Sequence, residues 1–278
     1  MLKNENSPEG RQPTTESEAR IFVEDLEVAY ATPSGSRVHA VVDFSLDIRR
    51  GEFLTLIGPS GCGKTSILKA VGGLITPDGG DVRIGDTIVT GPVPDQVAYV
   101  FQDFALFPWR TALGNVEVAL ELKKVPKAER RERAREALAT VGLADAADRH
   151  PHELSGGMKQ RVAVARALVS NCDVLLLDEP FGALDEQTRL VLGTELLRIL
   201  ESLGKTIIFV THNLQEAVYL SDRVVAMSAR PARIKEIIEV DIPRPRSPDI
   251  MVSEAFTEIQ RHLFSLLYEE SALAMNQP

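Results

Sequence analysis

The chain has 278 residues, which is long enough for one large α/β domain with a small appendage. Its 44% apolar and 26% charged residues are ordinary for a globular protein, and its net charge of −9 argues against a duplex nucleic-acid partner, which favours a basic face. No apolar run of about 18 uncharged residues is present to cross a membrane, so we expect a cytosolic chain unless a partner carries it elsewhere.

The N-terminal part of the sequence predicts a leader followed by antiparallel strands. Residues 1–19 are polar, contain Pro and Gly and lack the apolar segment of a signal peptide, so we expect a flexible leader. Residues 21–30 and 38–48 alternate apolar with polar side chains and flank a turn-forming segment, which predicts a β-hairpin or meander with one buried face. Residues 79–89 predict two further short strands around a turn.

Strands and helices alternate through the remainder of the chain. Four apolar runs predict buried strands, at residues 53–57, 97–101, 174–177 and 206–210. Residues 187–203 predict a helix that links the last two of these strands. Such alternation is typical of an α/β fold with a mainly parallel sheet.

Two segments are predominantly helical. Residues 112–170 contain a charged helix at 127–141 and a second helix at 155–169, which predicts a helical insertion in the α/β core. Residues 246–278 form a tail with apolar side chains at helical spacing (Phe256, Ile259, Leu263, Leu266 and Leu267). We expect this tail helix to pack on its own domain. A position on a membrane surface is the alternative, which four glutamates (Glu254, Glu258, Glu269 and Glu270) disfavour because they would repel anionic lipid.

Residues 58–65 read GPSGCGKT and lie between the predicted strand 53–57 and an expected helix. In this order a glycine-rich loop wraps its backbone N–H groups around a phosphate chain, and the helix N-terminus adds partial positive charge. Lys64 supplies a full charge and the Thr65 hydroxyl can ligate magnesium, so the chain is predicted to bind a nucleoside triphosphate. The plainer reading is a glycine-rich turn. For Cys62 within the loop, a small residue that fits is favoured over a redox role.

The other predicted buried strands also end in polar residues. Gln102 follows the second strand, Asp178 and Glu179 follow the third, and His212 ends the fourth. Ligands of open α/β sheets bind outside the carboxyl ends of the strands, so we expect these side chains to meet at the phosphate loop.

Each of these residues has a candidate role and a simpler alternative. Asp178 is suited to hold magnesium, and Glu179 to polarise a water that attacks the γ-phosphate. His212 can hydrogen-bond the γ-phosphate and Glu179, while Gln102 can help to place the magnesium and the water. Taken singly, an Asp-Glu pair is often a solvated strand end and a lone histidine is usually structural.

Residues 154–161 read LSGGMKQR and predict a second anion site. Ser155 is a plausible N-cap, and Gly156 and Gly157 leave the first N–H groups of the helix uncovered. One nucleotide has a single γ-phosphate, which Lys64 already binds. We therefore expect Ser155 and Gly157 to serve a nucleotide that is held by another subunit.

These motifs together resemble the ATP-binding subunit of an ABC transporter over residues 21–242. Walker A, Q-loop, signature, Walker B, D-loop and switch-histidine motifs occur in that order, at residues 58–65, Gln102, 154–160, 177–180, 183–185 and His212. The resemblance implies a P-loop NTPase core within a 20–245 domain, with an N-terminal antiparallel β subdomain and a helical subdomain at about 112–170 that carries the signature.

The same resemblance implies the site residues. Tyr30 would stack on adenine, and Asp185 would organise the dimer seam. The implied ATP-binding set is Tyr30, Gly58, Pro59, Ser60, Gly61, Cys62, Gly63, Lys64, Thr65, Ser66, Asp178, Ser155, Gly156, Gly157 and Asp185. The implied catalytic residues are Glu179, His212, Gln102 and Lys64, and the implied Mg²⁺ ligands are Thr65, Gln102 and Asp178.

A subgroup is indicated by residues 104–110 (FALFPWR), 181–185 (FGALD) and 243–246 (PRPR). They resemble importers of nitrate, sulfonates and taurine. Exposed aromatic residues beside Gln102 would form a groove for a helix of a membrane permease, unless Phe107 and Trp109 are ordinary core residues. The implied assembly is a head-to-tail dimer of this chain, or of this chain and a paralogue, at the cytoplasmic face of the inner membrane. It works with a permease and a periplasmic or lipid-anchored binding protein.

Two other functions compete with this one. An ABC ATPase that acts on nucleic acid or ribosomes usually fuses two nucleotide domains or carries long coiled coils, which this acidic chain lacks. A nucleotide-gated regulator would need no hydrolytic base, and Glu179 argues against that role.

Overall fold

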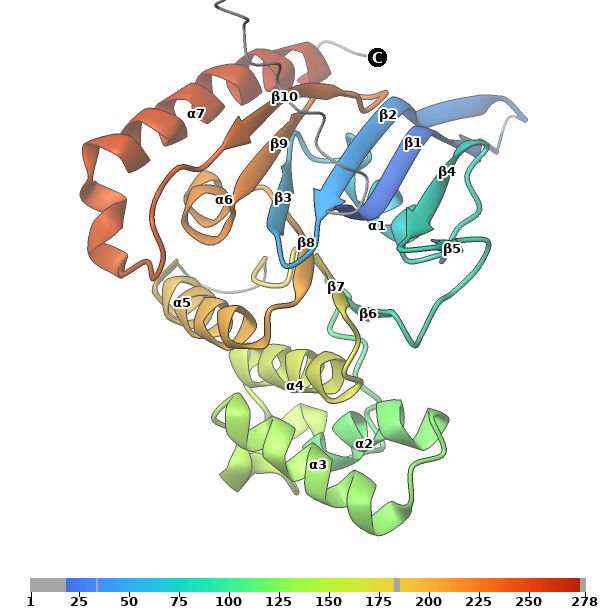
Figure 1. The fold of residues 1–278 in the computed structure, drawn as a ribbon, viewed down its shortest axis with the longest axis vertical. Coiled ribbons are helices and arrows are strands. Elements are labelled where there is room, and N and C mark those ends of the chain that lie inside the picture. The colour runs from blue at the N-terminus through green and yellow to red at the C-terminus, as the bar shows by residue number, and fades with distance from the viewer. Residues whose placement is uncertain (1–18, 34, 183–185, 276–278) are drawn as a thin grey trace, which may run out of the picture.

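The computed structural model describes residues 19–33, 35–182 and 186–275, in which two β-sheets are flanked by helices (Figure 1). Residues 1–18 of the predicted leader lie outside the described residues. Ala19, which the sequence places at the end of that leader, is instead the first residue of β1 (Ala19–Ala31).

The central sheet has six strands in the order β10-β9-β3-β8-β7-β6. Five of these strands run parallel to one another, namely β9, β3, β8, β7 and β6, and the edge strand β10 is antiparallel to β9. Four of them confirm the predicted buried strands, although β6 ends at Val100, one residue earlier than expected. Their bounds are β3 (Phe53–Ile57), β6 (Val97–Val100), β7 (Val174–Asp178), β8 (Thr206–Thr211), β9 (Arg223–Met227) and β10 (Ile234–Glu239).

Helices and a second sheet cover the two faces of this central sheet, so β3, β7 and β8 are buried along their whole length. Ile207 and Phe209 face an apolar cluster shared with the helices, while Ile208 and Val210 face a cluster shared with the second sheet. Because burial of each such side chain contributes about 1.5–3 kcal/mol, the alternation fixes the register of β8. The parallel strands consequently bring their carboxyl ends to one edge.

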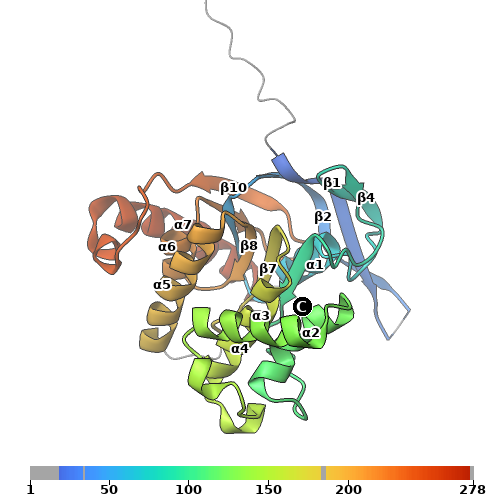
Figure 2. The ribbon, with the colours of Figure 1, turned by 60° about the horizontal axis from the view of Figure 1, so that its bottom comes forward.

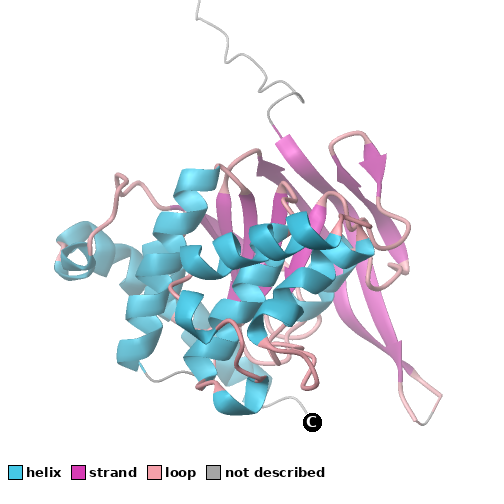
Figure 3. Cartoon of the chain, turned by 90° about the horizontal axis from the view of Figure 1, so that it is seen from below, coloured by secondary structure: helices cyan, strands magenta, loops and turns pink. Residues whose placement is uncertain are grey.

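The second sheet is antiparallel, with strand order β2-β1-β4-β5. It confirms the predicted N-terminal hairpin and the two short strands, with bounds β2 (Arg37–Arg49), β4 (Gly79–Ile84) and β5 (Thr87–Ile88). Figure 3 shows these strands at the side of the molecule opposite most of the helices. Helix α1 (Lys64–Val71) buries Ile67 and Leu68 in the cluster that joins the two sheets.

Helices α2 (Ala112–Leu122), α3 (Lys127–Thr140) and α4 (Gly156–Val169) lie together at one end of the molecule (Figure 1). Their contacts are mainly with each other, and α4 also contacts β6. The helices predicted at 127–141 and 155–169 are confirmed, each one residue shorter than expected: α3 ends at Thr140 and α4 begins at Gly156.

The C-terminal part contains α5 (Glu186–Leu203), α6 (Leu214–Leu220) and α7 (Glu254–Met275). Helix α7 lies along the β9–β10 side of the molecule, opposite the long β1–β2 hairpin (Figures 1 and 2). Phe256 and Leu263 are completely buried in the main apolar cluster, which confirms that the tail helix packs on its own domain. None of the described helices combines the length and apolar character of a bilayer-spanning segment.

Candidate nucleotide-binding site

The glycine-rich loop connects the end of β3 to the start of α1, as the sequence predicts. Two of its glycines are required by close contacts. A Cβ on Gly58 would lie 2.8 Å from the Met227 Cβ, and a Cβ on Gly63, whose φ is +130°, would lie 2.6 Å from the Ala40 carbonyl oxygen. The loop is therefore clamped between β9 and β2, which holds its backbone in place before any ligand arrives.

The Lys64 ammonium is buried inside the loop that carries it. Its Nζ donates hydrogen bonds of 2.9 Å to the carbonyl oxygens of both Gly58 and Pro59. Burial raises the pKa of the neighbouring Cys62 thiol, although Lys64 opposes this effect. Cys62 thus remains a protonated, buried thiol, which agrees with the interpretation of a small residue that fits the loop.

Asp178 joins the phosphate loop to the end of β7. Its Oδ1 accepts a 3.0 Å hydrogen bond from the Thr65 hydroxyl, and its Oδ2 accepts one of 3.0 Å from the Tyr99 hydroxyl. Burial raises the pKa of Asp178, while these two hydrogen bonds oppose the rise. A hydroxyl and a carboxylate thus lie together at a place where a cation would offset the cost of burying the charge.

Glu179 and His212 meet at the carboxyl edge of β7 and β8. The His212 Nδ1 lies 3.2 Å from the Glu179 Oε2, as the sequence predicts for this pair. Glu179 has a φ of +42°, a conformation that non-glycine residues seldom adopt, and its N–H donates a 2.9 Å hydrogen bond to the Val210 carbonyl. With this backbone turn, Glu179 lines the cavity over the phosphate loop.

A cavity of about 320 Å³ opens over the phosphate loop. Its lining brings together residues from distant parts of the sequence: Tyr30, Ala40, Ser60, Gly61, Gly63, Lys64, Thr65, Ser66, Gln102, Glu179 and Arg230. Tyr30 is 45% exposed, and its hydroxyl lies 2.9 Å from the Ser66 hydroxyl. The aromatic face of Tyr30 is therefore accessible at the rim of the cavity, as stacking on a base requires.

The predicted signature residues lie elsewhere in this chain. Ser155 caps α4 by accepting a 3.3 Å hydrogen bond from the Met158 N–H, which confirms the predicted N-cap. Ser155 and Gly156 are exposed, and none of residues 155–157 lines the cavity over the phosphate loop. Asp185, the predicted seam residue, lies outside the described residues.

The residues at the cavity fit ATP and Mg²⁺. The loop offers unobstructed backbone, a buried cation and a clamped conformation, and the cavity extends from Tyr30 to Glu179. Among the described residues there is no cluster of three or more His, Cys, Asp or Glu side chains suited to a metal. Thr65 and Asp178 would therefore share an Mg²⁺ with phosphate oxygens, which is how this ion is usually bound beside nucleotides.

Three residues near the site were missed by sequence reasoning. Tyr99 lies on β6, one position before the end of the strand, and its hydroxyl donates to Asp178. Arg230 lines the cavity from the β9–β10 connection, where no sequence motif marks it. The side chain of Asn115 is completely buried and hydrogen-bonds the backbone of Phe107, Arg110 and Thr111.

Asn115 thereby shapes the loop that precedes α2. Trp109 on this loop is 72% exposed, and its ring centroid lies 5.4 Å from that of the half-buried Phe107. Trp109 is therefore not a core residue, so the alternative interpretation fails for it. The two rings form an exposed aromatic surface on the segment that begins at Gln102.

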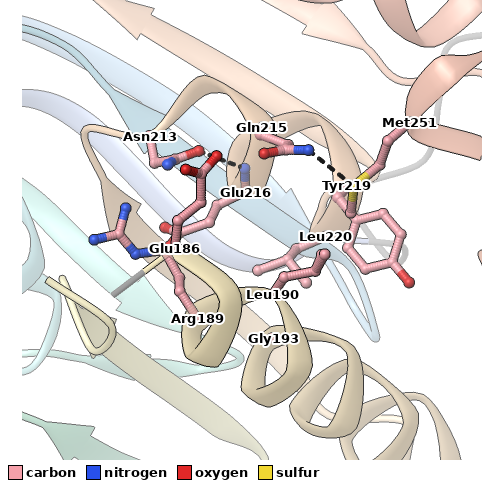
Figure 4. Close-up of a pocket in the computed structure, with 10 residues that line it drawn as sticks. All are labelled: Glu186, Arg189, Leu190, Gly193, Asn213, Gln215, Glu216, Tyr219, Leu220 and Met251. Carbon is pink, nitrogen blue, oxygen red and sulfur yellow. Dashed lines mark hydrogen bonds and ion pairs between the residues drawn. The ribbon is translucent and has the colours of Figure 1, made fainter. Parts of the chain in front are cut away.

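A separate small cavity of about 20 Å³ lies between α5 and α6, next to the segment that carries His212 (Figure 4). Asn213 caps α6 by accepting a 3.0 Å hydrogen bond from the Glu216 N–H. Glu216 also accepts a hydrogen bond from the Thr211 hydroxyl and lies 3.4 Å from the Arg189 Nε. The cavity is too small for a nucleotide, and these contacts serve to hold the end of β8.

Comparisons with known proteins agree with this site. The family model for ABC transporters matches residues 41–182. An ABC transporter ATP-binding protein of Methanocaldococcus jannaschii is 48% identical over 85% of this chain and 87% of its own length. The nitrate import ATP-binding protein of Synechococcus elongatus is a longer protein. It is 44% identical to this chain over 90% of this chain and 38% of its own length.

A solved structure shares the fold. A dimeric ATP-binding cassette in a post-hydrolysis state, bound to ADP and phosphate, superimposes with a TM-score of 0.72 and 32% identity over 80% of this chain and 100% of its own. The family model and the curated relatives both extend across the phosphate loop and the end of β7. The chain therefore belongs to the ABC transporter family, as an ATP-binding subunit that hydrolyses ATP in the service of transport.

Proposed function

We propose that the chain energises an importer of a small anion, such as nitrate, an alkanesulfonate or taurine, through a separate membrane permease. The observation that carries this proposal is the 44% identity to a nitrate import ATP-binding protein across 90% of the chain. A bicarbonate transport ATP-binding protein of Synechococcus elongatus, 42% identical over the same share of the chain, supports a small oxoanion as the cargo.

Within the site, Lys64 and the loop N–H groups bind the phosphates, and the ring of Tyr30 stacks on the base. Thr65 and Asp178, with Gln102, would hold Mg²⁺, which would supply charge neutralisation at the phosphates. Glu179 accepts a proton from the attacking water, and His212 orients Glu179 through the 3.2 Å contact between their side chains.

Each site needs a second chain. At the helix tip, Ser155 and Gly156 are exposed and Gly157 is half-buried, and none of the three lines the cavity of its own chain. In a head-to-tail dimer of two copies, or of one copy and a paralogue, this tip reaches the nucleotide of the partner, with Asp185 at the seam. The dimeric cassette with a TM-score of 0.72 to this chain supports such pairing.

The permease contacts the aromatic surface formed by Phe107 and Trp109. The segment that carries this surface begins at Gln102. A movement of Gln102 at the nucleotide is therefore transmitted to the membrane subunit through a single short segment. We place the complex at the cytoplasmic face of the inner membrane, with a substrate-binding protein on the other side and without nucleic acid. We keep residues 20–245 as the ATPase domain and 246–278 as its helical tail.

The test is reconstitution. The chain is co-expressed with its neighbouring permease genes, purified as a complex and placed in liposomes with the binding protein. We expect nitrate, sulfonate or taurine uptake that depends on ATP and a stimulated ATPase rate. Recovery of RNA or ribosomes in place of a membrane protein would contradict the proposal.

A further inference from the structure

The connection between β9 and β10 carries an arginine to the phosphate loop. Arg230 lines the cavity, and its Nη2 donates a 2.9 Å hydrogen bond to the Gly61 carbonyl oxygen. The connection itself is attached to β2, because the Ala232 N–H donates to the Ala40 carbonyl at 2.8 Å and the Ala232 carbonyl accepts from the Val42 N–H at 3.2 Å. Arg230 therefore reaches the cavity from a connection whose backbone is attached to β2 two residues later, at Ala232.

The charge of Arg230 is not neutralised by the protein around it. Within the described part of the chain, no carboxylate forms an ion pair with Arg230, whereas Arg233 in the same connection lies 2.9 Å from the Asp43 carboxylate. Glu179 is the acidic residue among those that line the cavity, and its carboxylate contacts His212. Arg230 thus adds a second cation, after Lys64, to a cavity that is suited to phosphates.

Lys64 and Arg230 are bound in the same way. Both donate to backbone carbonyls of the phosphate loop, Lys64 to Gly58 and Pro59, and Arg230 to Gly61, and Lys64 also makes a long 4.0 Å contact with the neutral Cys62 thiol. A carbonyl is a neutral acceptor. A hydrogen bond from a cation to a phosphate anion is about twice as strong as one between neutral groups. Both cations can therefore exchange a neutral partner for a charged one when a nucleotide enters.

We propose that Arg230 is a further nucleotide-binding residue, which pairs with the polyphosphate of the bound nucleotide. This inference rests on the proposed nucleotide site at residues 58–65. The guanidinium has five N–H donors in a planar fork, so one nitrogen keeps the Gly61 carbonyl while another donates to a phosphate oxygen.

The experiment measures binding of MgADP by isothermal titration calorimetry, because ADP is not consumed. Arg230→Gln removes the charge but keeps an amide that can donate to the Gly61 carbonyl, and Arg230→Lys keeps the charge. Arg233→Gln is the matched control on the same connection. We expect about a 5- to 20-fold weaker Kd for Arg230→Gln, a smaller loss for Arg230→Lys and no change for Arg233→Gln.

Ionic strength provides a second readout that a purely structural role would not alter. If Arg230 pairs with phosphate, the affinity of the wild type falls more steeply with added salt than that of Arg230→Gln. Binding by Arg230→Gln within about twofold of the wild type, with the same salt dependence, overturns the proposal. Lys64→Ala separates this result from a failure of the site itself: normal MgADP binding by Lys64→Ala would show that the site is elsewhere and overturn both proposals.

Discussion

At the scale of single residues, the site depends on a few backbone turns that direct side chains into one cavity. Glu179 follows Asp178 directly, yet the two carboxylates have different surroundings. Asp178 accepts hydrogen bonds from Thr65 and Tyr99, whereas Glu179 adopts a φ of +42° and contacts His212. The two residues can therefore serve separate roles, one in metal binding and one in water activation.

Replacement of Glu179 by Gln tests this division of roles. The amide keeps the size of the side chain and a contact to His212, but it cannot accept a proton from water. We expect nucleotide affinity to stay within about twofold and the ATPase rate to fall by about 10²–10⁴. Both quantities are measured on the same preparation, as steady-state phosphate release and as nucleotide binding. An ATPase rate close to that of the wild type would show that the base is a different group.

The location of a residue can be predicted from sequence where it belongs to a contiguous motif. The motifs around Lys64, Thr65, Asp178 and Glu179 indicate that these residues lie beside the phosphate loop, and the structure has them there. Arg230 was missed because its relation to the loop is set by the pairing of β9 with β3 and by the attachment of Ala232 to β2, which are contacts between distant segments.

At the scale of elements, helix α7 is fixed to the β9–β10 connection by a buried carboxylate. Glu270 accepts a 2.8 Å hydrogen bond from the Ala229 N–H and another of 2.8 Å from the Lys235 Nζ. Burial raises the pKa of Glu270, but the hydrogen bonds from Lys235 and Ala229 outweigh it and hold the pKa below its ordinary value of 4.5. Glu269 beside it contacts Lys235 from the exposed face of the helix.

We expect Glu270→Ala to lower the free energy of unfolding by about 1–3 kcal/mol, because the buried Ala229 N–H loses its acceptor. Glu269→Ala is the control and should change it by less than about 0.5 kcal/mol. The carboxylate is favoured in the folded state, so its contribution is present above pH 4.5 and is lost as the pH falls through the lowered pKa. Urea unfolding should show that Glu270→Ala loses less free energy of unfolding, relative to the wild type, in acid than at pH 7. An equal loss at both pH values would contradict this assignment.

The loop before α2 has a different role, since its aromatic surface is exposed. We expect Trp109→Ala to leave the stability and the ATPase rate of the isolated subunit unchanged, because the indole is 72% exposed and does not line the cavity. In the reconstituted transporter, uptake should fall by about tenfold as contact with the permease is lost. Phe264→Ala, which removes a 57% exposed ring on α7, is the matched control. Weakened nucleotide binding by Trp109→Ala would refute the docking role.

The sequence predicted most elements because their local composition is clear. The buried strands of the central sheet are mostly apolar runs, and α3 is a charged run of residues that favour a helix. Strands β9 and β10 were not predicted. The burial of β9 depends on its pairing with β3, a strand about 170 residues earlier in the chain, and this pairing is set by tertiary packing.

At the scale of the whole molecule, our proposal is that one chain carries the two halves of a reaction site on different surfaces. The cavity with Lys64 and Glu179 lies at the edge of the central sheet, while Ser155 and Gly157 are presented by α4. We expect Gly157→Arg to bind ATP with normal affinity and to lose hydrolysis by about 10²-fold or more, since the bulky side chain blocks the partner's phosphate. Equal loss of ATP binding would mean that Gly157 acts within its own chain.

The central claim is that ATP is hydrolysed only between two chains. The most direct measurement is the ATPase rate per chain over a range of protein concentrations, with the mass of the particles followed in parallel. The account predicts that the rate per chain rises with concentration and saturates as ATP-bound dimers form. A rate per chain that stays constant down to concentrations at which only monomers are present would contradict it.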